Sequence, residues 1–354
     1  MSLKNYFWSL VLILCTFFLT NVVFWMECSG RVFNGNDGHG DLLRLGNLPY
    51  AASITKQVHP EKHHTEFKDY LTSNADESFD ILTIGDSFSN GGGGSYYQDE
   101  LIRQTGLSIL NVPLQKHHPY EILAALENLG YLDRIHPKVI ILETVERGIN
   151  GTWGIEKLPS KTLTNDDFSS AAKSKKRHLS LMVKTNVLFL KNKILFHQHP
   201  YRLTDTTDMV PLDDAAFTAS NREQKLIFYH DDLSYQQAPA DCEKINTNLN
   251  RVAEELHQRG IQLIFLPGPD KFDVYYPQLP EVWKEQWPEN PFFDRMNALP
   301  KDYIFIDSRK PLRELVAHGE KDIYWSDDTH WSWKSHSVIC TEIIRQIKTA
   351  PPSR

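Results

Sequence analysis

Short apolar runs alternate with longer amphipathic stretches between residues 79 and 348. The apolar runs, which have strand length, are Phe79–Ile84, Leu107–Val112, Val139–Leu142, Ile261–Leu266 and Tyr303–Ile306. Segments with helical spacing are 96–104, 119–135, 241–259 and 335–348. Continuous apolar strands that alternate with helices are typical of a parallel sheet covered on both faces. The pattern therefore predicts an α/β fold: a three-layer sandwich around a parallel sheet of about five strands.

The N-terminus has a different pattern. From Tyr6 to Met26 the chain is almost wholly apolar, which is long enough to cross the ~30 Å hydrocarbon layer of a membrane as a helix. The segment runs into Trp25-Met26-Glu27-Cys28 without a small-x-small cleavage site, so we predict an uncleaved signal anchor. Lys4 on the short N-terminal side favours an external location for the remainder. We expect a single-pass protein of the inner (cytoplasmic) membrane, with its main domain in the periplasm or outside the cell.

The chain divides into three parts on this basis. Residues 1–28 form a cytoplasmic tip and transmembrane anchor, 29–75 a polar stalk, and 76–354 a catalytic domain. An insertion at about 150–235 breaks the alternation of strands and helices. It begins with an amphipathic stretch near 179–196 and continues with a polar, aspartate-rich portion. The insertion could form a lid or an acceptor-binding wall over the site. It could equally be a structural segment that packs on the edge of the sheet.

The composition makes nucleic-acid binding and zinc binding unexpected. The net charge is −7, and no basic run with interleaved aromatic residues is present, so nucleic acid is not an expected partner. No CxxC pair or cysteine–histidine spacing predicts zinc, and the histidines at 59, 63 and 64 lack a recognisable ligand spacing. We therefore expect no metal and no cofactor. Cys242 and Cys340 either pair in an oxidising compartment or remain as two buried thiols.

Two segments supply the parts of a serine nucleophile system. The first strand ends in Gly85-Asp86-Ser87-Phe88, and Asp327-Asp328-Thr329-His330-Trp331 precedes the last helix. Together they offer a hydroxyl, a general base and a carboxylate to orient the base. Asp327 and Asp328 both have a suitable spacing, and we favour Asp328. Glycines 91–94 closely follow the serine; they permit either close approach to a ligand or a flexible connection.

Reactive groups of parallel sheets gather at the carboxyl ends of the strands. Ser87 follows the first predicted strand, Asn111 lies near the end of the second, and residues 143–147 follow the third. This common position supports the assignment of one site to all three segments. An oxyanion hole could combine the Ser87 backbone N–H, the Asn111 amide and a donor near Arg147.

The serine and histidine motifs resemble those of the SGNH/GDSL hydrolase superfamily. The Asp-Thr-His-Trp form is most similar to the branch that O-acetylates exopolysaccharides, typified by the alginate acetylation proteins. Residues 140–147 resemble the acid-rich Glu-Arg motif of that branch, and residues 266–271 with the following tyrosines resemble its proline-lysine-tyrosine segment. The resemblance covers roughly residues 78–345. Two features differ: the serine here precedes the Asp-His segment, and no Gly-x-Asn-Asp block is present.

The resemblance implies a function. His330 would remove the proton of Ser87 as the serine attacks an acetyl carbonyl, and a sugar hydroxyl would then accept the acetyl group. The expected protein is an extracytoplasmic O-acetyltransferase for an exopolysaccharide or cell-envelope glycan. Its implied partners are that glycan and a multi-spanning membrane acyltransferase that supplies acetyl groups. Arg147, Lys271 and Trp331 are candidate substrate contacts.

Two alternatives remain at the level of sequence. The same residues would make a carbohydrate or lipid acetyl esterase if water replaced the sugar hydroxyl. A non-catalytic polysaccharide-binding or assembly protein could retain the fold without the reaction.

Overall fold

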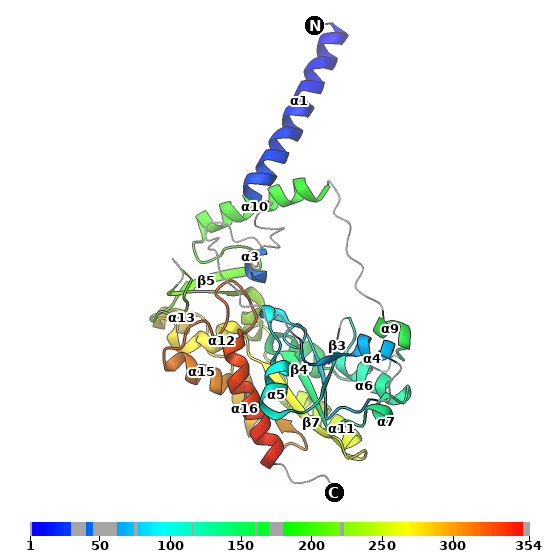
Figure 1. Ribbon diagram of the computed structural model, residues 1–354. Coiled ribbons are helices and arrows are strands. Elements are labelled where there is room, and N and C mark those ends of the chain that lie inside the picture. Colours follow the sequence, from blue (N-terminus) through cyan, green and yellow to red (C-terminus); the bar gives the residue numbers. More distant parts are fainter. Residues whose placement is uncertain are drawn as a thin grey trace.

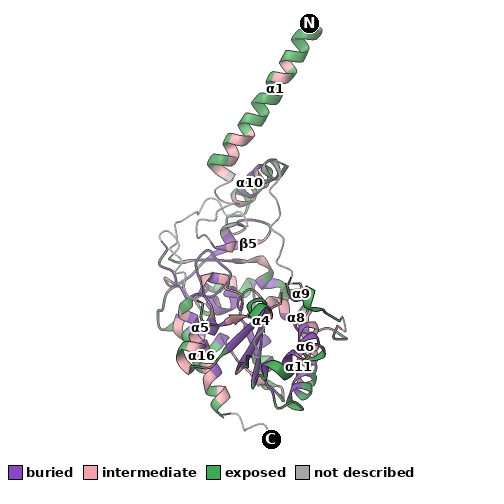
Figure 2. Ribbon diagram, turned by 45° about the vertical axis from the view of Figure 1, so that its right-hand side comes forward, coloured by how far each residue is buried: buried purple, intermediate pink, exposed green. Residues whose placement is uncertain are grey.

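The computed structural model describes residues 2–29, 40–44, 62–73, 77–114, 116–159, 162–169, 180–219 and 223–349. Helix α1 (Leu3–Phe24) projects away from the rest of the molecule, and its surface is largely exposed (Figures 1 and 2). A π-helical turn, Trp25–Ser29, follows it. Within the described chain, the stretch Leu3–Cys28 is the one helix long and apolar enough to cross a membrane, with a mean hydropathy of 2.2.

A six-stranded parallel sheet forms the centre of the molecule, in the order β1-β3-β2-β4-β7-β8. Its strands are β1 (Thr65–Glu66), β2 (Ile81–Gly85), β3 (Ile109–Pro113), β4 (Val139–Val145), β7 (Gln262–Gly268) and β8 (Ile304–Phe305). The predicted α/β fold with a parallel sheet is confirmed. The five predicted strands correspond to β2, β3, β4, β7 and β8, and the two-residue β1 adds a sixth at the edge beside β3.

The order of the strands reverses direction beside β2. The chain passes from β2 to β3 on one side and then to β4 on the other. At such a reversal, the connections leave the carboxyl ends of two neighbouring strands in opposite directions and open a space between them. Ser87, two residues after β2, lies at this point.

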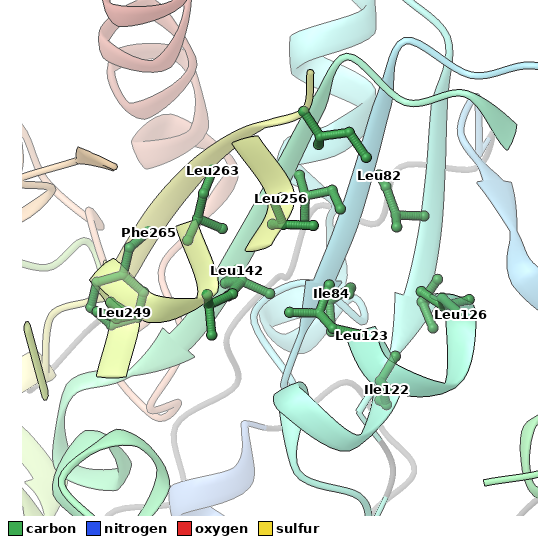
Figure 3. Packing of buried hydrophobic residues seen from close by; sticks show 14 of the residues in the cluster. Leu82, Ile84, Ile122, Leu123, Leu126, Leu142, Leu249, Leu256, Leu263 and Phe265 are labelled. Carbon is green, nitrogen blue, oxygen red and sulfur yellow. The ribbon is translucent and has the colours of Figure 1, made fainter. Parts of the chain in front are cut away.

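Helices cover both faces of the sheet, because alternate strand residues point to opposite sides. On one face, Leu82, Ile84 and Leu142 pack against α6 (Pro119–Asn128) and α11 (Cys242–His257) (Figure 3). The same layer contains α7 (Tyr131–Ile135) and α14 (Phe292–Ala298). The helix predicted over 119–135 is thus two helices, which Gly130 separates with a φ of 71°.

On the other face, Ile81, Ile141 and Ile264 pack against α5 (Tyr97–Thr105), α15 (Arg309–Ala317) and α16 (Trp333–Thr349). Cys340 lies in this layer, whereas Cys242 lies in the layer on the opposite face of the sheet. All four cysteines are free thiols. Of the two possibilities left by the sequence, the structure therefore has separate buried thiols.

The insertion contains α8 (Ile149–Trp153), α9 (Asn165–Ser169), α10 (Ser180–Gln198), and the antiparallel pair β5 (Thr207–Pro211) and β6 (Lys225–Tyr229). Its aspartate-rich portion thus forms a hairpin, whose Phe228 packs on Phe272 of α12 (Lys271–Tyr275) with ring centroids 4.8 Å apart. The short α13 (Glu281–Gln286) follows α12. Helix α10 packs against α1.

Much of the predicted stalk, residues 30–39 and 45–61 with His59, lies outside the described residues. The described parts pack on the domain: α3 (Asp41–Arg44) contacts β6, and α4 (Phe67–Ser73) buries Phe67 and Tyr70 in the core.

Candidate active site

Ser87 is exposed at the carboxyl end of β2, on a turn that buried side chains hold in place. The Asp86 carboxylate accepts a hydrogen bond from the backbone N–H of Phe88 (3.1 Å) and another from that of Val145 (2.8 Å). The second bond ties the serine turn to the end of β4. The aspartate of the Gly-Asp-Ser motif therefore fixes the nucleophile relative to the neighbouring strand.

Glu143 of β4 holds the same turn from below. Its Oε2 accepts hydrogen bonds from the backbone N–H of Asp86 (3.1 Å) and from both the N–H (3.1 Å) and the hydroxyl (2.8 Å) of Ser89. Burial, followed by the negative charge of Asp86, raises the pKa of Glu143 well above its ordinary value. Glu143 thus contributes one oxygen that accepts three hydrogen bonds from the serine turn.

Asn111 lies fully buried at the carboxyl end of β3. Its amide donates to Asn90 Oδ1 (3.0 Å), and its carbonyl accepts from the Thr83 hydroxyl (2.9 Å). Asn90 in turn donates to the carbonyl of Gly85 (2.9 Å). Asn111 thus contacts the residue that braces the serine turn. Its other side-chain hydrogen bonds within the described chain go to Thr83, Gln98 and Glu66, and none reaches Ser87.

His330 lies directly opposite the serine. Its Nε2 is 2.7 Å from Ser87 Oγ, and its Nδ1 is 2.6 Å from Asp328 Oδ1. An ionised carboxylate can only accept hydrogen bonds, so Nδ1 carries the proton and Nε2 is free to accept the serine proton. Asp327 is directed elsewhere: its Oδ2 accepts from the backbone N–H of Gly40 (2.7 Å). The structure thus brings Ser87, His330 and Asp328 into one hydrogen-bonded line.

Two of the four glycines after the serine, Gly92 and Gly93, lie against His330. A Cβ on Gly92 would lie 2.2 Å from Cδ2 of His330 and 2.6 Å from the Ser87 carbonyl oxygen. Gly93 has a φ of +78°, and its carbonyl accepts from the Trp325 indole N–H (2.8 Å). Close approach, rather than flexibility, explains the glycine at position 92.

A second carboxylate at the histidine comes from the segment predicted as stalk. Asp41 accepts hydrogen bonds from the backbone N–H (2.8 Å) and hydroxyl (2.6 Å) of Thr329, and its Oδ2 lies 3.6 Å from His330 Nδ1. Gly40 fits so tightly that a Cβ would lie 2.0 Å from the Asp327 carbonyl oxygen. Sequence reasoning missed Asp41 because no local pattern predicts a contact across almost the whole chain.

The charges around His330 act in opposite directions on its pKa. Burial would lower it, but the hydrogen bond and charge of Asp328, and then the charge of Asp41, raise the net pKa above the ordinary value. A smaller lowering effect comes from Arg147. The two carboxylates therefore make the imidazole a stronger base than an ordinary histidine.

Lys271 and Trp331, both predicted as substrate contacts, are fully buried. The Lys271 ammonium donates to the carbonyls of Trp325 (2.7 Å) and Ser326 (3.0 Å), which immediately precede the two aspartates. Trp331 packs edge-on against Phe88, with ring centroids 4.7 Å apart. In the structure, both side chains therefore lie in the interior and stabilise the segment that carries His330.

Arg147 is partly accessible, with 17% of its side chain exposed. Its Nη1 lies 2.6 Å from Asp270 and 3.2 Å from Asp232, and its guanidinium lies over the Tyr229 ring. Burial raises the pKa of Asp232 to about 6, and the neighbouring Arg147 opposes that shift. Nη2 and Nε make no hydrogen bond within the described part of the chain. These two donors are available to a ligand.

One group of described residues has the donor set of a metal site. Asp41, Asp328 and His330 each offer one ligand atom, and these atoms lie within 4.8 Å of one another. The same His330 Nδ1 already makes the 2.6 Å hydrogen bond to Asp328. A cation here would replace that hydrogen bond, so the observed geometry fits an orienting carboxylate better than a metal ligand.

A hydroxyl, an imidazole and a carboxylate in line at the carboxyl edge of a parallel sheet define an enzyme class that transfers or hydrolyses acyl groups. The comparison with known families agrees. Residues 223–353 match the SGNH hydrolase-like domain of the acetyltransferase AlgX. This match confirms the predicted resemblance in the part of the chain that contains Lys271, Asp328 and His330, while Ser87 lies outside it.

Two further comparisons are less informative. None of the curated proteins matches the chain. A solved structure from Bacteroides fragilis, provisionally described as an acylhydrolase, aligns with 70% of this chain and 88% of its own at 11% identity. Its TM-score of 0.21 is too low to bear on the fold.

Proposed function

We propose that this protein is an extracytoplasmic O-acetyltransferase, which carries an acetyl group on Ser87 to hydroxyls of an exopolysaccharide or cell-envelope glycan. The observation that carries the proposal is the line from Ser87 Oγ through His330 to Asp328, with distances of 2.7 and 2.6 Å. Its support as a transferase is the match of residues 223–353 to an acetyltransferase domain. The membrane helix α1 would keep the site near an export machinery, with a multi-spanning acyltransferase as acetyl donor.

The reaction has two balanced halves. His330 Nε2 takes the Ser87 proton as Oγ attacks the acetyl carbonyl, and returns it to the leaving group of the donor when the C–O bond breaks. The sugar hydroxyl then gives its proton to Nε2 as its oxygen attacks the acetyl-enzyme, and Ser87 recovers that proton. No net proton or electron is required.

Ser87 and Arg147 offer N–H donors for the two steps of the reaction. The Ser87 backbone N–H makes no hydrogen bond within the described chain, and neither do Nη2 and Nε of Arg147. Arg147 follows β4, the strand next to the serine turn. We assign the oxyanion contact to the Ser87 N–H and place Arg147 toward the acyl donor or the glycan.

A specific observation favours a second candidate, an acetyl esterase with the same residues. Ser87 is exposed, so water can reach an acetyl-enzyme as readily as a sugar hydroxyl can. A transferase and an esterase differ only in the acceptor of the acetyl group, which the chemistry of the triad does not determine.

The test uses the full chain in detergent with an activated acetyl ester, with and without oligosaccharide acceptors. Mass spectrometry follows acetyl on Ser87, on sugar and as free acetate. Ser87→Ala should abolish all three, whereas Ser337→Ala, which changes another exposed serine on α16, should leave them unchanged. Acetylated sugar supports the transferase, and free acetate alone supports the esterase. The absence of any Ser87-dependent product would reject both and favour a non-catalytic assembly protein.

A further inference from the structure

Helix α10 is fixed to the last turns of the membrane helix. The Asn186 side chain donates to the Asn21 carbonyl (2.8 Å) and to its side-chain oxygen (3.1 Å). Phe189 packs edge-on against Phe24, with ring centroids 5.2 Å apart. Figure 1 shows α10 lying across the lower end of α1, with the catalytic part of the molecule on its other side.

The level of this contact along α1 matches the edge of a bilayer. An α-helix rises ~1.5 Å per residue, so Asn21 lies about 27 Å along the axis from Leu3. The hydrocarbon layer is ~30 Å thick. If α1 crosses the membrane, a helix packed on Asn21 and Phe24 lies at the boundary between hydrocarbon and headgroups.

The two faces of α10 have different surroundings. Asn186, Phe189 and Asn192 are buried. Val187, Leu190 and Ile194 are 61%, 52% and 59% exposed.

The spacing of these exposed residues, i, i+3 and i+7, places them in one stripe along the helix. Among the described residues outside α1 and its π-helical turn, Val282 is the other large hydrophobic side chain that is more than half exposed. Exposed Lys184 and Lys191 lie beside the stripe. Lysines at the edge of an uncovered apolar stripe can place their charged ends among lipid headgroups while their apolar stems cover the stripe.

We propose that α10 lies in the lipid–water interface, with Val187, Leu190 and Ile194 among the acyl chains and the lysines among the headgroups. This proposal rests on the proposed membrane anchoring by α1 and extends it. Two elements, one through the bilayer and one along its surface, would hold the catalytic domain at a defined height and orientation. The lipid surface is thus a second partner of this chain.

The experiment places nitroxide labels at single cysteines in the full chain, in vesicles of phosphatidylcholine with phosphatidylglycerol. Cys15→Ala and Cys28→Ser remove the reactive background, while Cys242 and Cys340 are buried and do not label in the folded protein. Leu190→Cys reports on the stripe. Ile13→Cys, in the middle of α1, is the membrane reference, and Arg345→Cys, on α16, is the aqueous reference.

Collision of the label with oxygen, which concentrates in lipid, is compared with collision with a water-soluble nickel chelate. We expect the oxygen-to-nickel ratio at Leu190 to be several-fold above that at Arg345 and below that at Ile13. A Leu190 ratio equal to the Arg345 ratio, with Ile13 in lipid, overturns the assignment of α10 and leaves the anchor intact. A water-exposed Ile13 label overturns both.

A charge variant checks the result in the same vesicles. In the labelled Leu190→Cys protein, a further Ile194→Glu change should lower the oxygen-to-nickel ratio, because the added charge draws α10 out of the acyl chains, whereas Val282→Glu, at an equally exposed apolar residue on α13, should not. An equal effect of both changes would contradict an interfacial α10.

Discussion

His330 receives two carboxylates, and only one of them was evident from its position in the sequence. Asp328 is two residues away and predictable from spacing, whereas Asp41 reaches the histidine from the other end of the chain. A short sequence motif predicts only the residues that lie close together in the chain. It does not predict a residue that reaches the site through tertiary packing. For this reason the three residues of the triad could be predicted from the sequence, whereas Asp41 could not.

Asp41→Asn tests the electrostatic part of this arrangement. The negative charge of Asp41 helps to raise the His330 pKa, and the base acts in its neutral form, so activity rises with pH through that pKa. Loss of the charge should move the acidic limb of the kcat/KM profile to lower pH and reduce the plateau by no more than about tenfold. Asp69→Asn, at an exposed aspartate of α4, is the control. An unchanged acidic limb would show that Asp41 acts only through Thr329.

The buried Lys271 leads to a second prediction, which concerns how the stability of the fold depends on pH. Burial lowers its pKa from 10.5 to about 7, so between these pH values the folded protein binds fewer protons at this lysine than the unfolded chain does. Stability contributed by this group must therefore rise as pH increases from about 7 toward 10.5, and remain constant below 7.

The measurement is denaturant unfolding at pH 7 and 9.5 for the parent protein and for Lys271→Met. The stability difference between the two proteins should change between these pH values in favour of the parent. Lys310→Met, at an exposed lysine of α15, should show no such change. A difference that is constant with pH would mean that Lys271 is fully charged in the folded state.

At the scale of elements, strands and helices with their own hydrophobic pattern were predictable from the sequence. All five predicted strands are present; the central positions of β2, β3, β4 and β7 are buried, and those of β8 are half-buried. The three strands that were not predicted have a common property. The strand β1 has only two residues and forms through its pairing with β3, and β5 and β6 pair with each other within a polar insertion. Such elements depend on their partners, which a single segment does not reveal.

The glycine segment after β2 gives a prediction for one element. In Gly92→Ala, the added methyl group would lie 2.2 Å from His330, so the imidazole or the serine turn must move. A displacement near 1 Å in a catalytic group costs about 10²-fold in rate, and we expect a loss of this order in kcat. Gly151→Ala in α8, where a Cβ meets no atom within 4 Å, should retain full activity. Equal activity of the two variants would show that the glycine segment can move to accommodate a methyl group without displacing His330.

At the scale of the whole molecule, the sheet separates the two buried cysteines. A disulfide requires Cα atoms within ~7 Å, and Cys242 and Cys340 belong to helix layers on opposite faces. Reductant should therefore leave the unfolding midpoint unchanged. Alkylation after denaturation without reductant, followed by mass spectrometry, should find all four cysteines modified. A peptide that links residues 242 and 340 would contradict the fold.

The contact between Gly40 and Asp327 has a consequence for biosynthesis. The two residues are 287 positions apart, so at about 5–20 residues per second the ribosome makes the second on the order of tens of seconds after the first. During that time the nascent chain has its nucleophile but neither base nor orienting acid. Prematurely terminated products are therefore inert, and the chemistry begins only in molecules whose translation has run almost to the last helix.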